Sequence, residues 1–476
     1  MKLHERMSRR ALVGLAALGW AGALLAACAP AAPTPPAAAP TPAPKAAEKP
    51  AEKPAEKPAA TKPAAPAQAP AAGKAGVEVN LVAAKWVIDE WRLPDWIDAY
   101  NKTGPNKVNL EQVPDGWEAK VQAAIRSGDV AWDGVGIMTP FIDKVQWAES
   151  GMIQGIDQYI AGSNVDGAKE LLGDLVPTIK QDITYKGKVY GVPYSVEAIG
   201  LMFYRDPLAA VGYKDAPATW DDTLDAAKKV GDRFKTDQIT PIAWVGAIHT
   251  GIQGLTHTAT KNPYTEDGLL DITGEASQKA LRWMQTLVKE GVTPPHGSDG
   301  YLEIWQRAKL SMLLAQNSRG VWAQRVHGPE KADTAKLPLP AKGAANAGSP
   351  FWSNTFVVFE KAKQPQAYVD FLLWLLGPKN AEVHKAIIES GKAPTLNSIY
   401  RSQVETNPVF KWMALHRDMI ADSVPYPENT FWTIQNSKIN PWITKLMEKD
   451  SPLKPEEAMA NAQKEIKEEI AKQKVK

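Results

Sequence analysis

Strand-like and helix-like hydrophobic patterns follow one another from residue 77 onward. Residues 77–83 and 108–113 alternate between apolar and polar positions, which is typical of strands, and 130–138 is a further short strand. The segments 93–100, 117–126 and 141–149 instead show helical patterns. This alternation predicts an α/β fold in which parallel sheets are flanked by helices.

The pattern continues toward the C-terminus with four further helices. Residues 219–222 are similar to a capping box and open a helix that runs to Lys229. The other three helices are 277–289, 366–376 and 455–471, and glycines follow the first two. About 400 ordered residues exceed what a single core comfortably holds, so two lobes are expected.

The first 76 residues have a different composition. Residues 1–28 are expected to be a lipoprotein signal peptide, because a basic start is followed by an apolar run that ends in Leu25-Ala-Ala-Cys28. The sequence Ser8-Arg9-Arg10 is compatible with twin-arginine export or with an ordinary basic start. Residues 29–76 are rich in Pro and Ala and lack large apolar side chains, which predicts a disordered tether.

Cys28 is the only cysteine in the chain. The small residues before it resemble a lipobox, so we expect it to be lipidated and to anchor the chain to the outer face of the cytoplasmic membrane. The rest of the chain must then fold without a disulfide. The expected location is therefore exported and membrane-anchored, on the periplasmic or extracellular side.

Composition and motifs limit the function classes. The formal net charge is +2 with mixed charges, so no footprint for nucleic acid is present. No zinc-type histidine spacing, P-loop, nucleophile elbow or dinucleotide motif occurs, so we expect no metal, no cofactor and no enzyme. A carboxylate pair for glycoside hydrolysis stays open as an alternative. The 17 tryptophans outnumber the 12 tyrosines and the 9 phenylalanines, and this surplus of flat aromatic surface favours a carbohydrate ligand.

Six segments carry recognisable motifs in a fixed order: 185–206, 218–222, 276–291, 309–322, 348–360 and 391–397. Together they resemble family 1 extracellular solute-binding proteins over nearly all of 77–476. The resemblance implies a two-lobed periplasmic-binding-protein-like fold of type II, with a hinge and a ligand cleft between discontinuous lobes. By this resemblance lobe one is 77–195 plus 348–405, and lobe two is 196–347 plus 406–476.

The resemblance also implies a function and partners. We expect a monomer that binds a carbohydrate, an oligosaccharide in particular, by hinge closure and delivers it to the permease subunits of an ABC transporter. Polyamines, phosphorylated polyols and peptides stay open as ligands, and so does service to a sensor or surface display instead of transport. The stretch 316–322 is longer than the family's Gly-x-Trp segment, so Trp322 is not assigned to the cleft.

Candidate ligand residues lie at the expected strand ends, because strand ends feed the cleft in doubly wound folds. Sugars need aromatic faces and carboxylate or amide edges. The residues that follow the expected strands are Trp86, Asp89, Glu90, Trp91, Asp115, Trp117, Thr139, Phe141 and Trp244. The alternative for each of them is core packing or an ordinary helix start.

The resemblance supplies the other candidates. Glu197, close to Tyr194 at the expected first crossing, matches a sugar-binding glutamate of the family, and Trp432 matches a stacking aromatic. A hinge salt bridge is the alternative for Glu197, and core packing is the alternative for Trp432. The further candidates are Asn317, Arg319, Trp352 and Asn354, and Trp352 stands where the family usually carries a small residue.

Overall fold

The computed structural model describes residues 76–474, apart from 114–117, 129, 138–139, 295–299, 408–409 and 411. The predicted signal peptide, tether and Cys28 therefore lie outside the described residues. So do Asp115, Trp117 and Thr139, and the side chain of Phe141. No helix among the described residues is long and apolar enough to span a membrane.

Eight strands of the described part form one mixed sheet in the order β2-β1-β3-β10-β6-β8-β7, and β9 pairs with β6 outside this path. β1 is parallel to β2 and β3, and β7 is parallel to β8. β6 and β10 are antiparallel to their neighbours. The strands of this sheet are β1 (Glu78–Ala84), β2 (Lys107–Val113), β3 (Gly134–Ile137), β6 (Val192–Tyr204), β7 (Thr240–Trp244), β8 (Leu310–Gln316), β9 (Ala332–Ala335) and β10 (Phe351–Val358), while β4 (Thr184–Tyr185) and β5 (Lys188–Val189) form a separate hairpin.

Helices connect these strands and cover the sheet. The α-helices are α2 (Lys85–Glu90), α3 (Leu93–Thr103), α4 (Glu118–Ser127), α5 (Pro140–Glu149), α6 (Asp157–Gly162), α7 (Leu171–Asp174), α8 (Pro177–Asp182), α9 (Arg205–Ala209), α10 (Trp220–Arg233), α11 (Gly254–Ala259), α12 (Glu275–Lys289), α13 (Gly300–Gln306), α14 (Asn317–His327), α15 (Pro365–Leu376), α16 (Ala381–Glu389), α17 (Asn397–Ile399), α18 (Trp412–Ala421), α19 (Trp432–Leu446) and α20 (Pro455–Lys474). Short 3₁₀ or π-helical segments are η1 (Ala168–Glu170), η2 (Gly246–Gln253) and η3 (Tyr400–Val404).

The α/β alternation predicted from the hydrophobic pattern is confirmed. All ten predicted elements occur, and their ends lie within four residues of the predicted ones. Thr219 caps α10 as expected, since its side-chain oxygen accepts a hydrogen bond from the Asp222 N–H. Other elements were missed, among them α8, α16 and α19, and also α2, since 85–90 continues directly from β1 as a helix.

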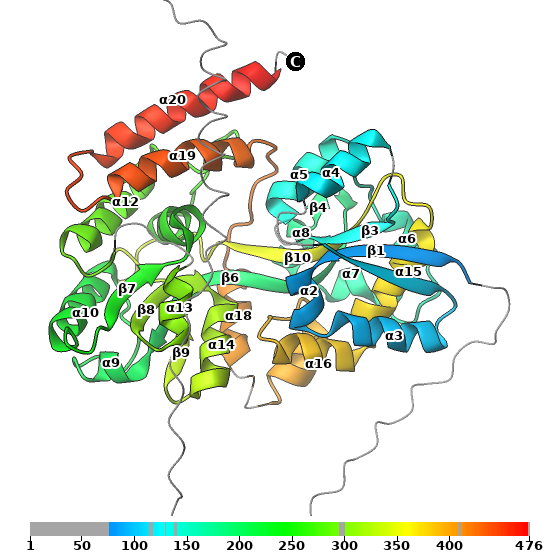
Figure 1. Ribbon diagram of the computed structural model, residues 1–476, viewed down its shortest axis with the longest axis horizontal. Helices are drawn as coiled ribbons and strands as arrows, with labels where there is room; N and C mark the ends of the chain where they lie inside the picture. Colours follow the sequence, from blue (N-terminus) through cyan, green and yellow to red (C-terminus); the bar gives the residue numbers. More distant parts are fainter. Residues whose placement is uncertain are drawn as a thin grey trace, which may run out of the picture. The chain divides into compact units, whose positions relative to one another are not determined.

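β6 joins two halves of the sheet. It is 13 residues long and buried throughout. Its first half pairs with β10, whereas its second half pairs with β8 and β9. Figure 1 shows β6 and β10 running side by side between β1 and β3 at one end and β7 and β8 at the other. A strand buried on both faces is typical of the centre of a doubly wound sheet.

The halves of the sheet have separate hydrophobic cores. The first core draws on residues between 79 and 198 and between 351 and 420. The second draws on residues between 199 and 352 and between 432 and 466, with a satellite cluster around β8. The assignment of all of 406–476 to lobe two is corrected by this packing, because Phe410, Met413, Met419 and Ile420 belong to the first core.

Candidate functional site

Four charged residues from distant parts of the chain meet where β1 and β8 end beside β6. Glu90 is the last residue of α2, which begins directly after β1. Arg319 lies in the first turn of α14, which begins directly after β8. Glu197 lies on β6, and Lys392 follows α16. We call Glu90, Glu197, Arg319 and Lys392 the charged cluster.

Lys392 is the centre of the charged cluster. Its ammonium lies 2.5 Å from Glu197 Oε1 and 3.4 Å from Glu90 Oε1. The other Glu197 oxygen accepts a hydrogen bond of 3.3 Å from the Ser318 N–H at the start of α14. The side chains of Lys392 and Glu197 are only 9% and 4% exposed, whereas that of Glu90 is 32% exposed. The ion pair thus connects a loop of the first core to a helix start beside the second.

Burial and neighbouring charge compete at each member of this cluster. Burial raises the pKa of Glu90, and the Lys392 ammonium only partly opposes that rise. Burial would lower the pKa of Lys392, but Glu197 and Glu90 outweigh it, so the pKa of Lys392 is raised. Arg319 acts electrostatically on both Glu90 and Lys392. The cluster therefore sets two acidic side chains against two basic ones.

The charged cluster keeps hydrogen-bonding capacity that the described residues do not use. Glu90 Oε2 is buried without a hydrogen-bond partner among them, and so is Arg319 Nε. The half-buried Trp86 ring lies beside Lys392, whose ammonium is 5.7 Å from the ring centroid. An acceptor, a donor and an aromatic face together match the hydroxyl edge and ring face of a sugar.

A second group of side chains, the aromatic cluster, consists of Tyr264, Tyr426 and Trp432. Ring centroids lie 6.1 Å apart for Tyr264 and Tyr426, 5.8 Å for Tyr264 and Trp432, and 5.3 Å for Tyr426 and Trp432. The two pairs with Trp432 meet edge to face, which is a favoured geometry for aromatic rings. Both tyrosines are half-buried, whereas Trp432 is only 2% exposed and belongs to the second core, as the alternative of core packing expects. Trp432 Nε1 has no partner among the described residues.

The loop that carries Tyr426 reaches the first half of the sheet. The Lys186 N–H donates a 3.3 Å hydrogen bond to the Glu428 carboxylate across 242 residues of sequence. Asp182, at the end of α8, acts electrostatically on Tyr426. Its carboxylate accepts a 2.9 Å hydrogen bond from the Ser353 N–H of β10. The aromatic cluster thus has buried polar groups of the first half next to it.

Three of the predicted aromatic platforms are corrected by the structure. Trp91 and Tyr194 stack on each other at 5.5 Å inside the first core, and Trp244 is fully buried in the second. All three are at most 1% exposed. Their rings fill space beside the sheet, so the alternative of core packing holds for them.

The other predicted residues take mixed positions. Asp89 lies on the exposed side of α2 in an ion pair with Lys85. The Asn317 side chain accepts a 2.7 Å hydrogen bond from the Ala198 N–H, and its amide nitrogen lies 3.1 Å from His416. Asn354 donates a 2.9 Å hydrogen bond to Ser195, while its Oδ1 has no partner among the described residues. Trp352 is buried in the second core.

The structure adds residues that the sequence analysis missed. Lys392 lies in the Gly-Lys-Ala-Pro turn, where a lone lysine shows no pattern. Tyr264 and Tyr426 lie in loops without strand or helix periodicity. The one signal for Lys392 in the sequence was the family-like turn at 391–397. This turn brings the chain back to β6, where the Val196 N–H donates a 3.0 Å hydrogen bond to the Ala393 carbonyl.

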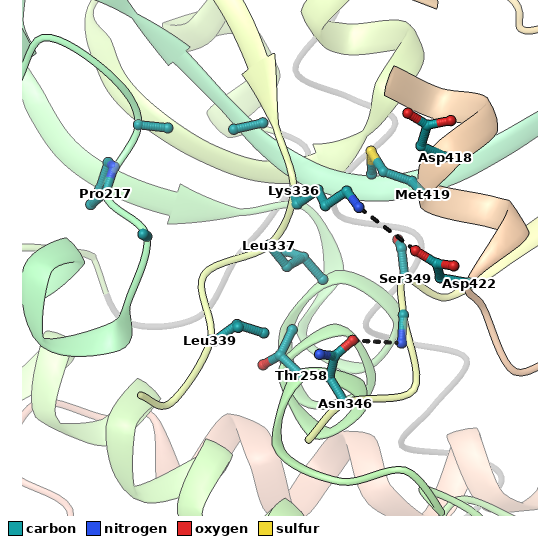
Figure 2. Close-up of a pocket in the computed structure, with 14 residues that line it drawn as sticks. Pro217, Thr258, Lys336, Leu337, Leu339, Asn346, Ser349, Asp418, Met419 and Asp422 are labelled. Carbon is teal, nitrogen blue, oxygen red and sulfur yellow. Dashed lines mark hydrogen bonds and ion pairs between the residues drawn. The ribbon is translucent and has the colours of Figure 1, made fainter. Parts of the chain in front are cut away.

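A separate cavity of about 440 Å³ lies beside α18 and contains none of the predicted ligand residues. Figure 2 shows it between Lys336 and Leu337 on one side and Asp418, Met419 and Asp422 on the other. Lys336 and Asp422 approach to 3.8 Å at its edge. Its other lining residues are small or apolar for the most part, and no group of metal-ligating side chains occurs among the described residues.

Comparisons with known proteins agree with this architecture. A model described as bacterial extracellular solute-binding protein matches residues 90–382. The chain is 29% identical to a lactose-binding protein of Rhizobium radiobacter over 225 residues, which is 45% of this chain and 51% of the relative. The match therefore spans about half the length of that curated relative. A probable ABC transporter-binding protein of Deinococcus radiodurans is 21% identical over 357 residues, covering 72% of this chain and 80% of the relative.

Solved structures resemble the fold at low sequence identity. Maltose-bound MalE3 of T. maritima superposes with a TM-score of 0.68 at 18% identity, covering 82% of this chain and 99% of the other. The maltotriose-bound maltotriose-binding protein of Thermus thermophilus gives a TM-score of 0.67 at 19% identity, covering 82% and 100%. These likenesses confirm the predicted two-lobed type II fold.

Proposed function

Because the chain belongs to the bacterial extracellular solute-binding protein family, we propose that it captures a neutral sugar outside the cytoplasm for an ABC importer. Relatives support both parts of the proposal, since one is a lactose-binding protein and another a probable ABC transporter-binding protein. Members of a solute-binding family hold and release their ligand, so the chain acts as a binding protein and not as an enzyme.

The observation that carries the sugar assignment is the charged cluster with Trp86 beside it. Its two carboxylates and two cations sum to zero charge, which offers no net attraction to a polyamine or to a phosphate. The unused oxygen of Glu90 and the unused Nε of Arg319 can accept from and donate to sugar hydroxyls. Trp86 supplies a ring face, and the aromatic cluster supplies further stacking area.

An oligosaccharide fits this arrangement better than a monosaccharide. The candidate contacts come from two groups: Trp86, Glu90, Glu197 and Arg319 on one hand, and Tyr264, Tyr426 and Trp432 on the other. A ligand with several sugar rings offers enough hydroxyl groups and ring faces to engage both groups, and this supports an oligosaccharide. Closure of the two halves about β6 and β10 would then depend on ligand contacts, as in other hinge proteins.

Ligand screening by thermal unfolding of the purified chain tests this function. A ligand at about 100 times its Kd should raise the free energy of unfolding by about 2.7 kcal/mol. We expect maltose-type or lactose-type oligosaccharides to raise the unfolding temperature while spermidine and peptides leave it unchanged. A shift with spermidine or a peptide, and with no carbohydrate, would overturn the sugar assignment.

We also propose that Cys28 carries a lipid and that the segment 29–76 lets the folded part stand away from the membrane. The lipobox-like sequence Leu25-Ala-Ala-Cys28 supports this proposal. Labelled fatty acid fed to expressing cells should appear in the chain and be lost from the Cys28→Ala variant. Equal labelling of both proteins would contradict the anchor.

A further inference from the structure

The surroundings of the Lys392 ammonium are those of a cation-binding site. Two carboxylates, Glu197 and Glu90, lie 2.5 and 3.4 Å from its nitrogen. The Trp86 ring lies on a third side, with its centroid 5.7 Å from the nitrogen. Carboxylates together with an aromatic face form the usual surroundings of bound ammonium ions in proteins.

We propose that Lys392 is a specificity-determining residue: its tethered ammonium fills a cation box formed by Trp86, Glu90 and Glu197, so that the site accepts neutral polyhydroxylated solutes and rejects amines. This inference rests on the proposed sugar-binding function. It names the residue that decides between two solute classes that the sequence left open, carbohydrates and polyamines.

The charge balance of the cluster depends on Lys392. With it, two carboxylates face two cations. Without it, the Glu90 and Glu197 carboxyl groups face Arg319 alone, which leaves in a mostly buried place either one uncompensated negative charge or one carboxyl group that must be protonated. A buried unpaired charge is strongly unfavourable, so the emptied box should attract any small cation of the right shape.

The shape of the emptied box is defined by the atoms that Lys392→Ala removes. They are three methylene groups and the ammonium, which n-propylammonium reproduces in length and charge. The Lys392 side chain is 9% exposed, so its removal leaves an enclosed space that water alone cannot neutralise. A free propylammonium ion should therefore take the place of the lost side chain.

Binding of n-propylammonium to the full chain tests the box. We expect Lys392→Ala to bind it at least about tenfold more tightly than the wild type does, measured by calorimetry. Uncharged n-propanol should not bind to Lys392→Ala. The double variant Lys392→Ala/Glu197→Gln should lose most of the increase in affinity for n-propylammonium. The matched control is Lys379→Ala, because Lys379 is 53% exposed and pairs with Glu170 at 3.4 Å on the surface. No gain for Lys392→Ala, or an equal gain for Lys379→Ala, would overturn the proposal.

Two further readouts separate the possible failures. If Lys392→Ala does not fold, its refolding is repeated with excess propylammonium, and continued failure counts against the box. Sugar binding by the wild type is measured in parallel. A wild type that binds no sugar while Lys392→Ala binds propylammonium would contradict the proposed function and leave the box intact. A wild type that binds spermidine in competition with a sugar would contradict the specificity role.

Discussion

The charged cluster and the aromatic cluster are assembled in different ways. The four residues of the charged cluster are spread over 302 positions of the chain, from Glu90 to Lys392, and come from elements beside both cores. The three rings of the aromatic cluster all pack against or within the second core. The first cluster therefore depends on how the two halves of the sheet meet. The rings of the second are packed in one half, and only the loop that carries Tyr426 also bonds to the other half, through Glu428.

The two clusters also differ in how much each member needs the others. A buried ion stays favourable only while its partner and hydrogen bonds are in place, so each charged residue fixes its neighbours. Aromatic rings are held by area and by broad edge-to-face preferences, which tolerate small shifts. The comparison suggests that the charged cluster sets the geometry of the site and the aromatic cluster adds adaptable contact area.

Removal of Glu197 should have the largest effect. Glu197→Ala leaves Lys392 buried with only the more distant carboxylate of Glu90, and loss of one partner of a buried pair costs about 3–5 kcal/mol. The free energy of unfolding, measured by urea denaturation, should fall by that amount, and sugar affinity should fall with it.

The matched control for this variant is Glu170→Ala. Like Glu197, Glu170 pairs with a lysine. Its distance to Lys379 is 3.4 Å, and its side chain is 62% exposed. Its loss should cost less than about 1 kcal/mol. Equal costs for the two variants would show that the charged cluster is no more cooperative than a surface pair, and the contrast between the clusters would disappear.

The α/β class and ten of the elements could be predicted from the sequence because these elements follow local rules. Period-2 and period-3.6 patterns located the ten elements that were predicted, and the Thr219 cap was visible as a motif. The helix α2 was missed because 85–90 is too short to show a helical period. The return of 410–420 to the first core was missed because lobe membership is decided by tertiary packing.

The candidate site was only partly predictable. Glu90 was found because polar residues after strands lie at the sheet edge, and Glu197 and Arg319 because they lie in segments that resemble the family. Trp91 and Trp244 also follow or end strands, yet they point into the cores, since position along the chain does not give side-chain direction. Lys392 was missed because its partners are 195 and 302 residues away, a pairing that no local pattern indicates.

Acid should weaken the aromatic cluster through His257, with an effect smaller than that of Glu197→Ala. His257 is fully buried, and its Nε2 lies 2.9 Å from the Tyr264 hydroxyl. Burial lowers its pKa from 6.5 to about 3. Between pH 6.5 and about 3, His257 is therefore protonated in the unfolded chain but neutral in the folded chain. The stability that depends on neutral His257 is complete above pH 6.5 and is lost progressively as the pH falls toward about 3. Near pH 4.5 the loss should be about 2–3 kcal/mol.

The His257→Gln variant isolates this contribution, because a glutamine amide can still bond to the Tyr264 hydroxyl but does not titrate. The free energy of unfolding is measured at neutral pH and near pH 4.5 for both proteins. The decrease between the two pH values should be smaller in the variant by about 2–3 kcal/mol. His384→Gln serves as the comparison in the first core, where burial lowers the pKa of His384 to about 4. It should reduce acid sensitivity without changing the near-ultraviolet signal of Tyr264, Tyr426 and Trp432. If the pH dependence of the free energy of unfolding is unchanged in His257→Gln, His257 gains no proton on unfolding. The aromatic cluster would then have no acid sensitivity of its own.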